Sequence, residues 1–182
     1  MMFDCCLFIF CYNKIMTKLI IIRGPAGVGK TTIAKAVAKQ LNGVHFNIDQ
    51  VLRDAGLDKS EGDIPVDNFL QAQESIFPEV KKYLEQGEPV VFDGNFYYQE
   101  QIDQLTREFP DQVNIFTLQA SLETCWERNK TKEEHQLDRI SVEAMHRISS
   151  NLKVGKVIDT EGKSEEEVIN EIISAIIKEE DK

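Results

Sequence analysis

The feature that most constrains the fold is the run from Gly24 to Thr31, which fits the pattern Gly-x-x-x-x-Gly-Lys-[Ser/Thr] without departure. The apolar segment 19–23 precedes this run, and a helical pattern begins at Lys30. The order predicts a strand, a phosphate-binding loop and a helix. Glycines let backbone N–H groups turn inward around phosphates, and the helix adds its positive end. A chain organised around this unit is expected to adopt an α/β fold.

The loop predicts a site for ATP and Mg²⁺. Lys30 would bring a positive charge to the β- and γ-phosphates, and the Thr31 hydroxyl would be a magnesium ligand. Asp93 ends a second apolar strand, and its carboxylate is expected to hold magnesium through water. The remaining residues expected to surround the nucleotide are Gly24, Pro25, Ala26, Gly27, Val28, Gly29 and Thr32.

The rest of the chain alternates strand and helix patterns, which predicts one domain with a parallel sheet covered on both faces. The predicted strands cover residues 19–23, 44–48, 89–92, 113–118 and 156–158. The predicted helices begin at Lys30 and cover residues 99–108, 122–130, 142–152 and 165–178.

Two segments fall outside this alternation. Residues 62–86 have a helical pattern and form an insertion, in which Pro78 is expected to break the helix or begin a second one. Residues 130–139 are polar and charged, which makes them a candidate lid.

The first fifteen residues differ in composition from the rest. The apolar run 5–11 is too short to span a bilayer, and the segment lacks the features of a signal peptide. We therefore expect residues 1–15 to lie outside the fold, with Met16 as the true start and the domain covering 16–182. The alternative is that this segment is a membrane or lipid anchor through Cys5 and Cys6.

The charge and the cysteines narrow the range of partners. A formal net charge of −10 argues against binding of bulk nucleic acid or anionic membrane surfaces. The cysteine spacing fits neither a disulfide framework nor a zinc site, so we expect a reducing, cytoplasmic location. The oligomeric state is left open. The four cysteines are Cys5, Cys6, Cys11 and Cys125.

Asp49 and Arg53 follow the second predicted strand. A helix beginning at Asp49 would place both side chains on one face near the carboxyl edge of the sheet. Asp49 could take the proton of an acceptor hydroxyl, and Arg53 could hold an anionic part of the acceptor. The alternatives are a helix N-cap for Asp49 and a solvated surface position for Arg53. Asn95 is also expected to contact the acceptor.

Three cations, Arg128, Lys132 and Arg139, surround the candidate lid. A cation that arrives when a lid closes stabilises the charge spread over a transferring phosphoryl group. Arg128 is the favoured residue, because it ends the helix after the fourth strand. The alternative is a solvated face whose charges are balanced by neighbouring acids. The histidines are expected to be isolated and without a ligand role; they are His45, His135 and His146.

Two absences favour phosphoryl transfer to a bound acceptor. Gly94 rather than Glu follows Asp93, unlike in many motor ATPases, and no Asn-Lys-x-Asp segment marks a GTPase. With these features, the chain from Thr17 to about Lys178 resembles the small P-loop kinases, such as adenylate, shikimate and gluconate kinases. Within this group it looks most like the ATP-binding AAA-domain proteins.

The resemblance implies a three-layer fold with a five-stranded parallel sheet of order 2-3-1-4-5. It also implies that the 62–86 insertion binds the acceptor and that the lid follows the fourth strand. Asp49 would be the base, and the 159–162 loop would contact adenine. The string Asp93-Gly94-Asn95-Phe96-Tyr97 lacks the arginine that adenylate kinases carry there, which argues against AMP as the acceptor.

The sequence therefore predicts an ATP-dependent kinase of a small hydroxylated or phosphorylated molecule. Two alternatives stay open. One is a nucleic-acid end kinase, and the other is a non-catalytic protein that uses ATP binding as a switch.

Overall fold

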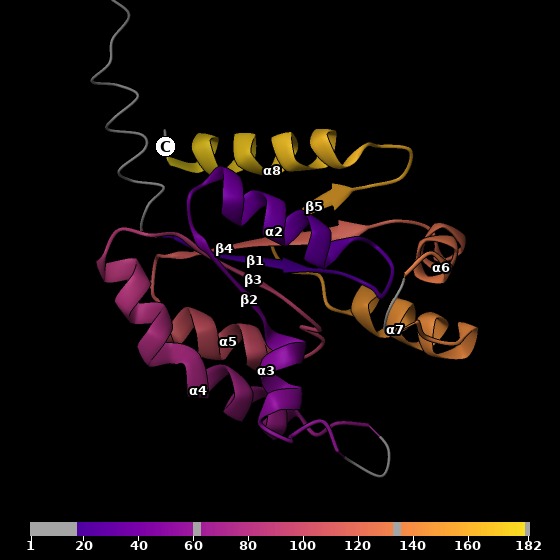
Figure 1. Cartoon of the computed structure of the whole chain (residues 1–182), viewed down its shortest axis with the longest axis horizontal. Coiled ribbons are helices and arrows are strands. Elements are labelled where there is room, and N and C mark those ends of the chain that lie inside the picture. The colour runs from indigo at the N-terminus through magenta and orange to yellow at the C-terminus, as the bar shows by residue number, and fades with distance from the viewer. Residues whose placement is uncertain (1–17, 60–62, 133–135, 181–182) are drawn as a thin grey trace, which may run out of the picture.

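The computed structural model describes residues 18–59, 63–132 and 136–180 (Figure 1), so the predicted extension 1–15 lies outside the described residues. Five strands form one parallel sheet of order β2-β3-β1-β4-β5, as predicted. The strands are β1 Leu19–Arg23, β2 Val44–Asn47, β3 Val90–Asp93, β4 Val113–Gln119 and β5 Lys156–Asp159.

Helices cover both faces of this sheet. In Figure 1, α2 and α8 lie on one side, and α4 and α5 lie on the other. Apart from α3 and α4, their bounds agree with the predicted helices to within three residues. The helices are α2 Lys30–Gln40, α3 Ile48–Asp54, α4 Val66–Glu85, α5 Gln99–Glu108, α6 Leu122–Lys130, α7 Arg139–Asn151 and α8 Glu165–Glu180.

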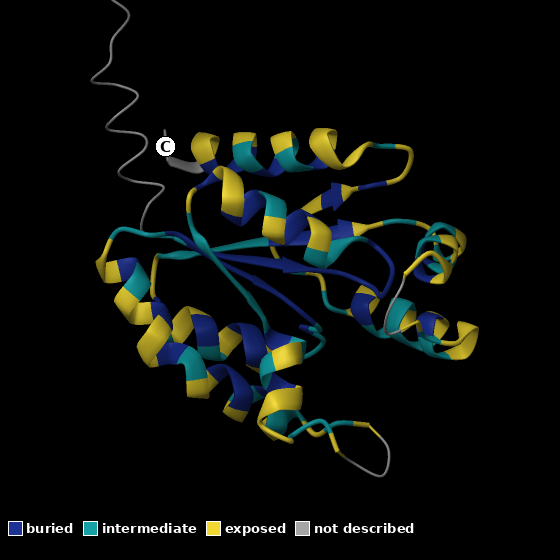
Figure 2. Ribbon diagram, viewed as in Figure 1, coloured by how far each residue is buried: buried dark blue, intermediate teal, exposed yellow. Residues whose placement is uncertain are grey.

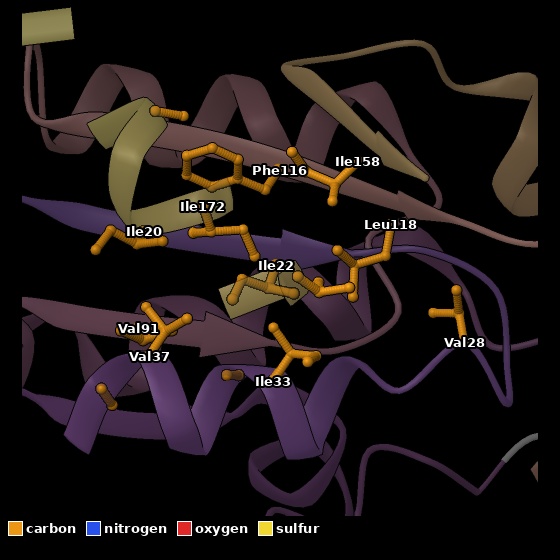
Figure 3. Packing of buried hydrophobic residues seen from close by; sticks show 14 of the residues in the cluster. Ile20, Ile22, Val28, Ile33, Val37, Val91, Phe116, Leu118, Ile158 and Ile172 are labelled. Carbon is orange, nitrogen blue, oxygen red and sulfur yellow. The ribbon is translucent and has the colours of Figure 1, made fainter. Parts of the chain in front are cut away.

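The central strand β1 is buried on both faces, so its sequence is a continuous apolar run rather than an alternating one. Its side chains nevertheless alternate between two cores. Leu19 and Ile21 belong to the core under α4 and α5, and Ile20 and Ile22 belong to the core under α2 and α8. Figure 2 shows the buried central strands between helices with exposed outer faces. Figure 3 shows the core under α2 and α8, with Ile33, Val37 and Ile172.

Pro78 does not break the insertion, which is a correction to the sequence prediction. A single helix, α4, runs through it. An interior proline costs a helix about 3 kcal/mol. Burial of Phe77, Val80 and Leu84 on the same helix stabilises it by roughly 1.5–3 kcal/mol per side chain, which offsets that cost. Pro78 itself is exposed.

The helix after β2 begins one residue earlier than predicted. Asn47 is its N-cap, and its side-chain Oδ1 accepts a hydrogen bond of 2.8 Å from the Gln50 N–H. The expected alternative that Asp49 caps this helix is therefore wrong. The carboxylate of Asp49 is left available for other contacts.

The sheet register brings three strand ends together. Asp93 at the end of β3 lies opposite Ile22 on one side and opposite Asn47 on the other. Because all the strands are parallel, the loops that follow them open at the same edge, where sheets of this kind bind ligands. No helix in the described ranges is long and apolar enough to cross a membrane.

Candidate nucleotide and acceptor site

The Gly24–Thr31 loop is packed closely against its neighbours. Gly27 has φ of 81°, and a Cβ there would lie 2.0 Å from the Cys125 carbonyl oxygen of α6. A Cβ on Gly24 would lie 2.5 Å from the Leu118 carbonyl oxygen of β4. Only glycine fits at both positions, so α6 and β4 hold the loop in its curled form.

The N-terminus of α2 suits an anion. No side chain caps it, and no acidic residue lies in its first turn. The Lys30 Nζ donates a hydrogen bond of 3.0 Å to the Pro25 carbonyl across the loop. Burial lowers the pKa of Lys30, whereas the nearby carboxylates of Asp49 and Asp93 raise it. The arrangement fits a triphosphate bound by backbone N–H groups and one lysine.

Asp93 is the centre of a buried polar cluster. Its side chain is 1% exposed. The Thr31 hydroxyl donates to Oδ2 at 2.5 Å, the Asn47 side-chain amide donates to the same oxygen at 3.0 Å, and His45 Nε2 lies 2.5 Å from Oδ1. The structure thus brings Thr31 and Asp93 together, as the predicted magnesium site requires.

His45 is not isolated, which corrects the sequence interpretation. Successive side chains of a strand alternate between faces, so His45 and Asn47 point to the same side of β2. That side faces Asp93 on β3. The alternation of the polar residues His45 and Asn47 with apolar neighbours along the strand could have indicated this cluster.

The residues present fit magnesium only together with a nucleotide. Among the described residues, no group of three or more His, Cys, Asp or Glu side chains forms a cation site. Thr31 and Asp93 offer hard oxygen ligands, and Mg²⁺ usually completes its shell with water and phosphate oxygens.

Asp49 lies on α3 and contacts the loop after β3. Its Oδ1 accepts a hydrogen bond of 3.0 Å from the backbone N–H of Asn95. Burial raises the pKa of Asp49, while the positive charge of Lys30 lowers it. Asn95 thus contacts Asp49 through its backbone. Arg53 lies one turn further along α3, exposed, with its Nη2 2.7 Å from Gln50 Oε1.

Arg128 connects the phosphate loop to the loop after β5. Its Nη1 donates to the Val28 carbonyl at 3.3 Å and to Thr160 Oγ1 at 2.9 Å, and its Nη2 donates to the Thr160 carbonyl at 2.9 Å. A cavity of about 280 Å³ lies against these residues, Thr32 and Lys163. This is the region where the family resemblance implied contact with adenine.

The predicted lid, 130–139, is only partly described, since residues 133–135 lie outside the described ranges. In addition to the effects of burial, Asp49 and Asp93, the positive charge of Lys132 lowers the pKa of Lys30. Arg139 instead pairs with Glu123 at 2.9 Å and lies 5.9 Å from the ring centre of Trp126. Lys132 follows α6, with its backbone N–H bound to the Asn129 carbonyl at 3.3 Å, and Arg139 lies on the exposed side of α6.

Arg23 was not identified from the sequence as a site residue. It is fully buried at the end of β1. Its guanidinium donates four hydrogen bonds of 2.8–3.1 Å, to the carbonyls of Phe96, Ser149 and Leu152 and to the Thr117 hydroxyl. Burial lowers its pKa to about 10, so Arg23 stays charged at neutral pH. No local sequence signal marks a contact with three distant segments.

Comparison with known proteins agrees with this geometry. The family model described as AAA domain matches residues 19–152. A protein of Pyrococcus furiosus named "Putative adenylate kinase" is 31% identical over 169 residues, which cover 87% of this chain and 83% of that protein.

Among solved structures, a sugar kinase from Janibacter has a TM-score of 0.71 at 19% identity, covering 87% of this chain and 93% of that one. A gluconokinase from Sinorhizobium meliloti has a TM-score of 0.69 at 16% identity, covering 90% and 93%. At these identities the two structures establish the fold alone. With the phosphate loop, the sheet order and the family match together, the chain belongs to the AAA domain family, and its fold is that of the small P-loop kinases.

Proposed function

We propose that this protein is an ATP-dependent kinase that transfers the γ-phosphoryl group to a small hydroxylated or phosphorylated acceptor. The observation that carries the proposal is the position of Asp49, whose carboxylate affects the pKa of Lys30 while its Oδ1 binds the loop after β3. A carboxylate beside a phosphate loop can meet an acceptor hydroxyl where the γ-phosphate would lie. The kinase name of the Pyrococcus furiosus relative supports the same reaction class.

ATP would supply the phosphoryl group, and Mg²⁺ would neutralise its charge. The residues that would hold them are the loop Gly24–Thr31 with Thr32, the Thr31 hydroxyl and the Asp93 carboxylate. His45 and Asn47 fix the orientation of Asp93 through both of its oxygens.

Asp49 would act as the base. Its raised pKa makes it a stronger proton acceptor than an exposed aspartate. The acceptor oxygen forms a bond to the γ-phosphorus, its proton passes to Asp49, and the bond from the γ-phosphorus to the bridging oxygen breaks. ADP then leaves with that oxygen.

Three cations would stabilise the transferring group. Lys30 lies within the loop, and Arg128 donates a hydrogen bond to the Val28 carbonyl of the same loop. Besides burial, the charge of Lys132 lowers the pKa of Lys30. Arg139 would have to leave Glu123 before it could contribute.

The test is ADP release by the full chain with Mg²⁺-ATP, measured alone and with sugars, nucleosides, hydroxy acids and nucleic-acid ends. We expect ADP release to depend on a small acceptor and to disappear in Lys30→Ala. Lys39→Ala, an exposed lysine on the same helix, is the control and should behave as wild type.

Two other outcomes would replace the proposal. Turnover only with nucleic-acid ends would indicate an end kinase. Tight Mg²⁺-ATP binding with no acceptor-dependent ADP release would indicate a nucleotide-binding switch.

A further inference from the structure

The loop that follows β3 is held in place by its backbone. The N–H of Asn95 binds Asp49, the carbonyl of Phe96 accepts a hydrogen bond of 3.0 Å from Arg23 Nε, and the N–H of Tyr97 donates at 3.0 Å to Gln101 Oε1. Three separate elements thus fix three successive residues.

The hydroxyl of Tyr97 is buried and has no hydrogen-bond partner among the described residues. A buried donor without a partner costs stability, so native proteins seldom keep one without a reason. Burial raises the pKa of this phenol, the negative charge of Asp49 raises it further, and Arg23 lowers it. The hydroxyl therefore stays protonated. Tyr97 also lies two residues after Asn95, whose N–H binds the Asp49 carboxylate.

Asp49 offers a complementary acceptor. Its Oδ1 is bound to the Asn95 N–H, and within the described ranges no hydrogen bond reaches Oδ2. An acceptor hydroxyl placed between Tyr97 and Asp49 would accept a hydrogen bond from the phenol and donate its own proton to the carboxylate. One donor and one acceptor at these positions suit an alcohol, because a hydroxyl group can accept one hydrogen bond and donate another.

The arginines of the chain argue against a phosphorylated acceptor. All six arginines lie in the described ranges, so the position of each relative to Asp49 is known. They are Arg23, Arg53, Arg107, Arg128, Arg139 and Arg147.

Five of these arginines lie on elements other than α3, the helix that carries Asp49. Arg23, Arg128 and Arg139 have partners of their own. Arg107 and Arg147 are exposed on α5 and α7.

Arg53 is the one arginine with an effect on the pKa of Asp49. It lowers this pKa, but its effect is smaller than those of burial, Lys30 and other neighbours. It is exposed and hydrogen-bonded to Gln50. Proteins that recognise phosphate groups generally use clusters of arginines with bidentate geometry. A single exposed arginine does not provide such a cluster.

We propose that the acceptor is an uncharged polyhydroxylated molecule, and that the hydroxyl of Tyr97 and the carboxylate of Asp49 bind the hydroxyl group that is phosphorylated. The proposal rests on the kinase function proposed above and names its substrate class. Tyr98, the next residue, packs on Phe69 of the insertion, with ring centres 5.9 Å apart. Binding pockets generally combine apolar side chains with a few placed polar groups.

The experiment uses matched pairs of acceptors that differ by one phosphate: ribose and ribose 5-phosphate, glucose and glucose 6-phosphate, adenosine and AMP. ADP release by the full chain is measured for each member at fixed Mg²⁺-ATP. We expect turnover with an uncharged member, and a higher KM or no turnover with its phosphorylated counterpart. The three pairs also distinguish a free sugar from a nucleoside as the source of the hydroxyl.

Variants test the role of Tyr97 with the best uncharged acceptor from these pairs. Tyr97→Phe should raise the KM for the acceptor by about tenfold, because one hydrogen bond to the acceptor is lost. Mg²⁺-ATP affinity should not change, and the melting temperature should stay equal or rise, because the removed hydroxyl has no protein partner. Tyr83→Phe is the matched control, since its ring packs on Phe46 of β2, and it should leave the KM unchanged.

The possible results lead to different conclusions. Turnover confined to the phosphorylated members, or a larger KM increase in Arg53→Ala than in Tyr97→Phe, would overturn the uncharged acceptor and leave the kinase function intact. A wild-type KM in Tyr97→Phe would overturn the role of the phenol. No acceptor-dependent ADP release with any acceptor, including those used in the test of the proposed function, would overturn both proposals.

Discussion

Asp49 holds a carboxylate in a partly buried position beside Lys30 and the backbone of Asn95. Because burial raises its pKa above the ordinary value of 3.8, the folded protein binds the Asp49 proton more tightly than the unfolded chain does. The resulting stability is present at acid pH and is lost as the pH rises from that value through the folded pKa. At neutral pH the charged group therefore lowers the stability of the fold, as expected for a residue kept for chemistry.

Asp49→Asn separates the charge of this residue from its hydrogen bond. The amide oxygen can still accept from the Asn95 N–H, so the loop should stay in place. We expect turnover to fall about 10²–10⁴-fold, because the base is lost. The melting temperature at pH 7 should rise, and its difference from wild type should shrink towards pH 4.

Thermal melts between pH 4 and pH 8 and acceptor-dependent ADP release measure these effects. Asp54→Asn, the same substitution in an exposed position on α3, is the control and should change neither quantity much. Wild-type turnover in Asp49→Asn would mean that Asp49 is not the base.

At the scale of elements, Arg23 joins parts of the fold that are distant in the chain. It connects the end of β1 with the loop after β3, with Thr117 of β4 and with the last turn of α7. The carbonyls at a helix C-terminus lack partners within the helix and carry partial negative charge, so a buried cation satisfies them well. Arg23 thus fixes α7, the helix after the predicted lid, to the strand that leads into the phosphate loop.

Arg23→Met should lower the free energy of unfolding by about 3 kcal/mol or more. Three backbone carbonyls would lose their donor, and each buried unsatisfied polar group costs about 1–3 kcal/mol. Urea denaturation followed by circular dichroism measures the change. Arg147→Met, an exposed arginine on α7, should stay within about 0.5 kcal/mol of wild type. Equal stability of the two variants would show that water can replace the guanidinium.

At the scale of the whole molecule, the proposed nucleotide site draws on segments that follow four different strands of the sheet. The phosphate loop follows β1, Asp93 ends β3, Arg128 lies on α6 and Thr160 follows β5. A ligand that contacts all of them binds only the folded chain. Nucleotide binding should therefore be linked to global stability.

Mg²⁺-ATP at about one hundred times its Kd should add about 2.7 kcal/mol, which corresponds to a rise of roughly 5–10 °C in melting temperature. The rise should be lost in Lys30→Ala and reduced when EDTA removes magnesium. Thermal melts with and without nucleotide test this. The same rise in wild type and Lys30→Ala would place the nucleotide elsewhere on the protein.

Local patterns in the sequence were sufficient to predict much of this protein. The spacing of the loop glycines with Lys30 and Thr31 indicated the phosphate site, and apolar periodicity located the strands and most helix bounds. The sheet order followed from the family resemblance and is confirmed. These features depend on residues close in the chain, or on a fold shared by a whole family, so sequence alone can indicate them.

Other features were decided only by the tertiary structure. Asn47 rather than Asp49 caps α3, Pro78 stays inside a helix held by its buried neighbours, and His45 binds Asp93. The partners of Arg23 lie 73 to 129 residues away in the chain. Such contacts arise where parallel strands end at one edge, and they bring together side chains that no local pattern relates. The loop motif therefore predicted a phosphate site, and the packing of the sheet edge decided which polar groups lie beside that loop.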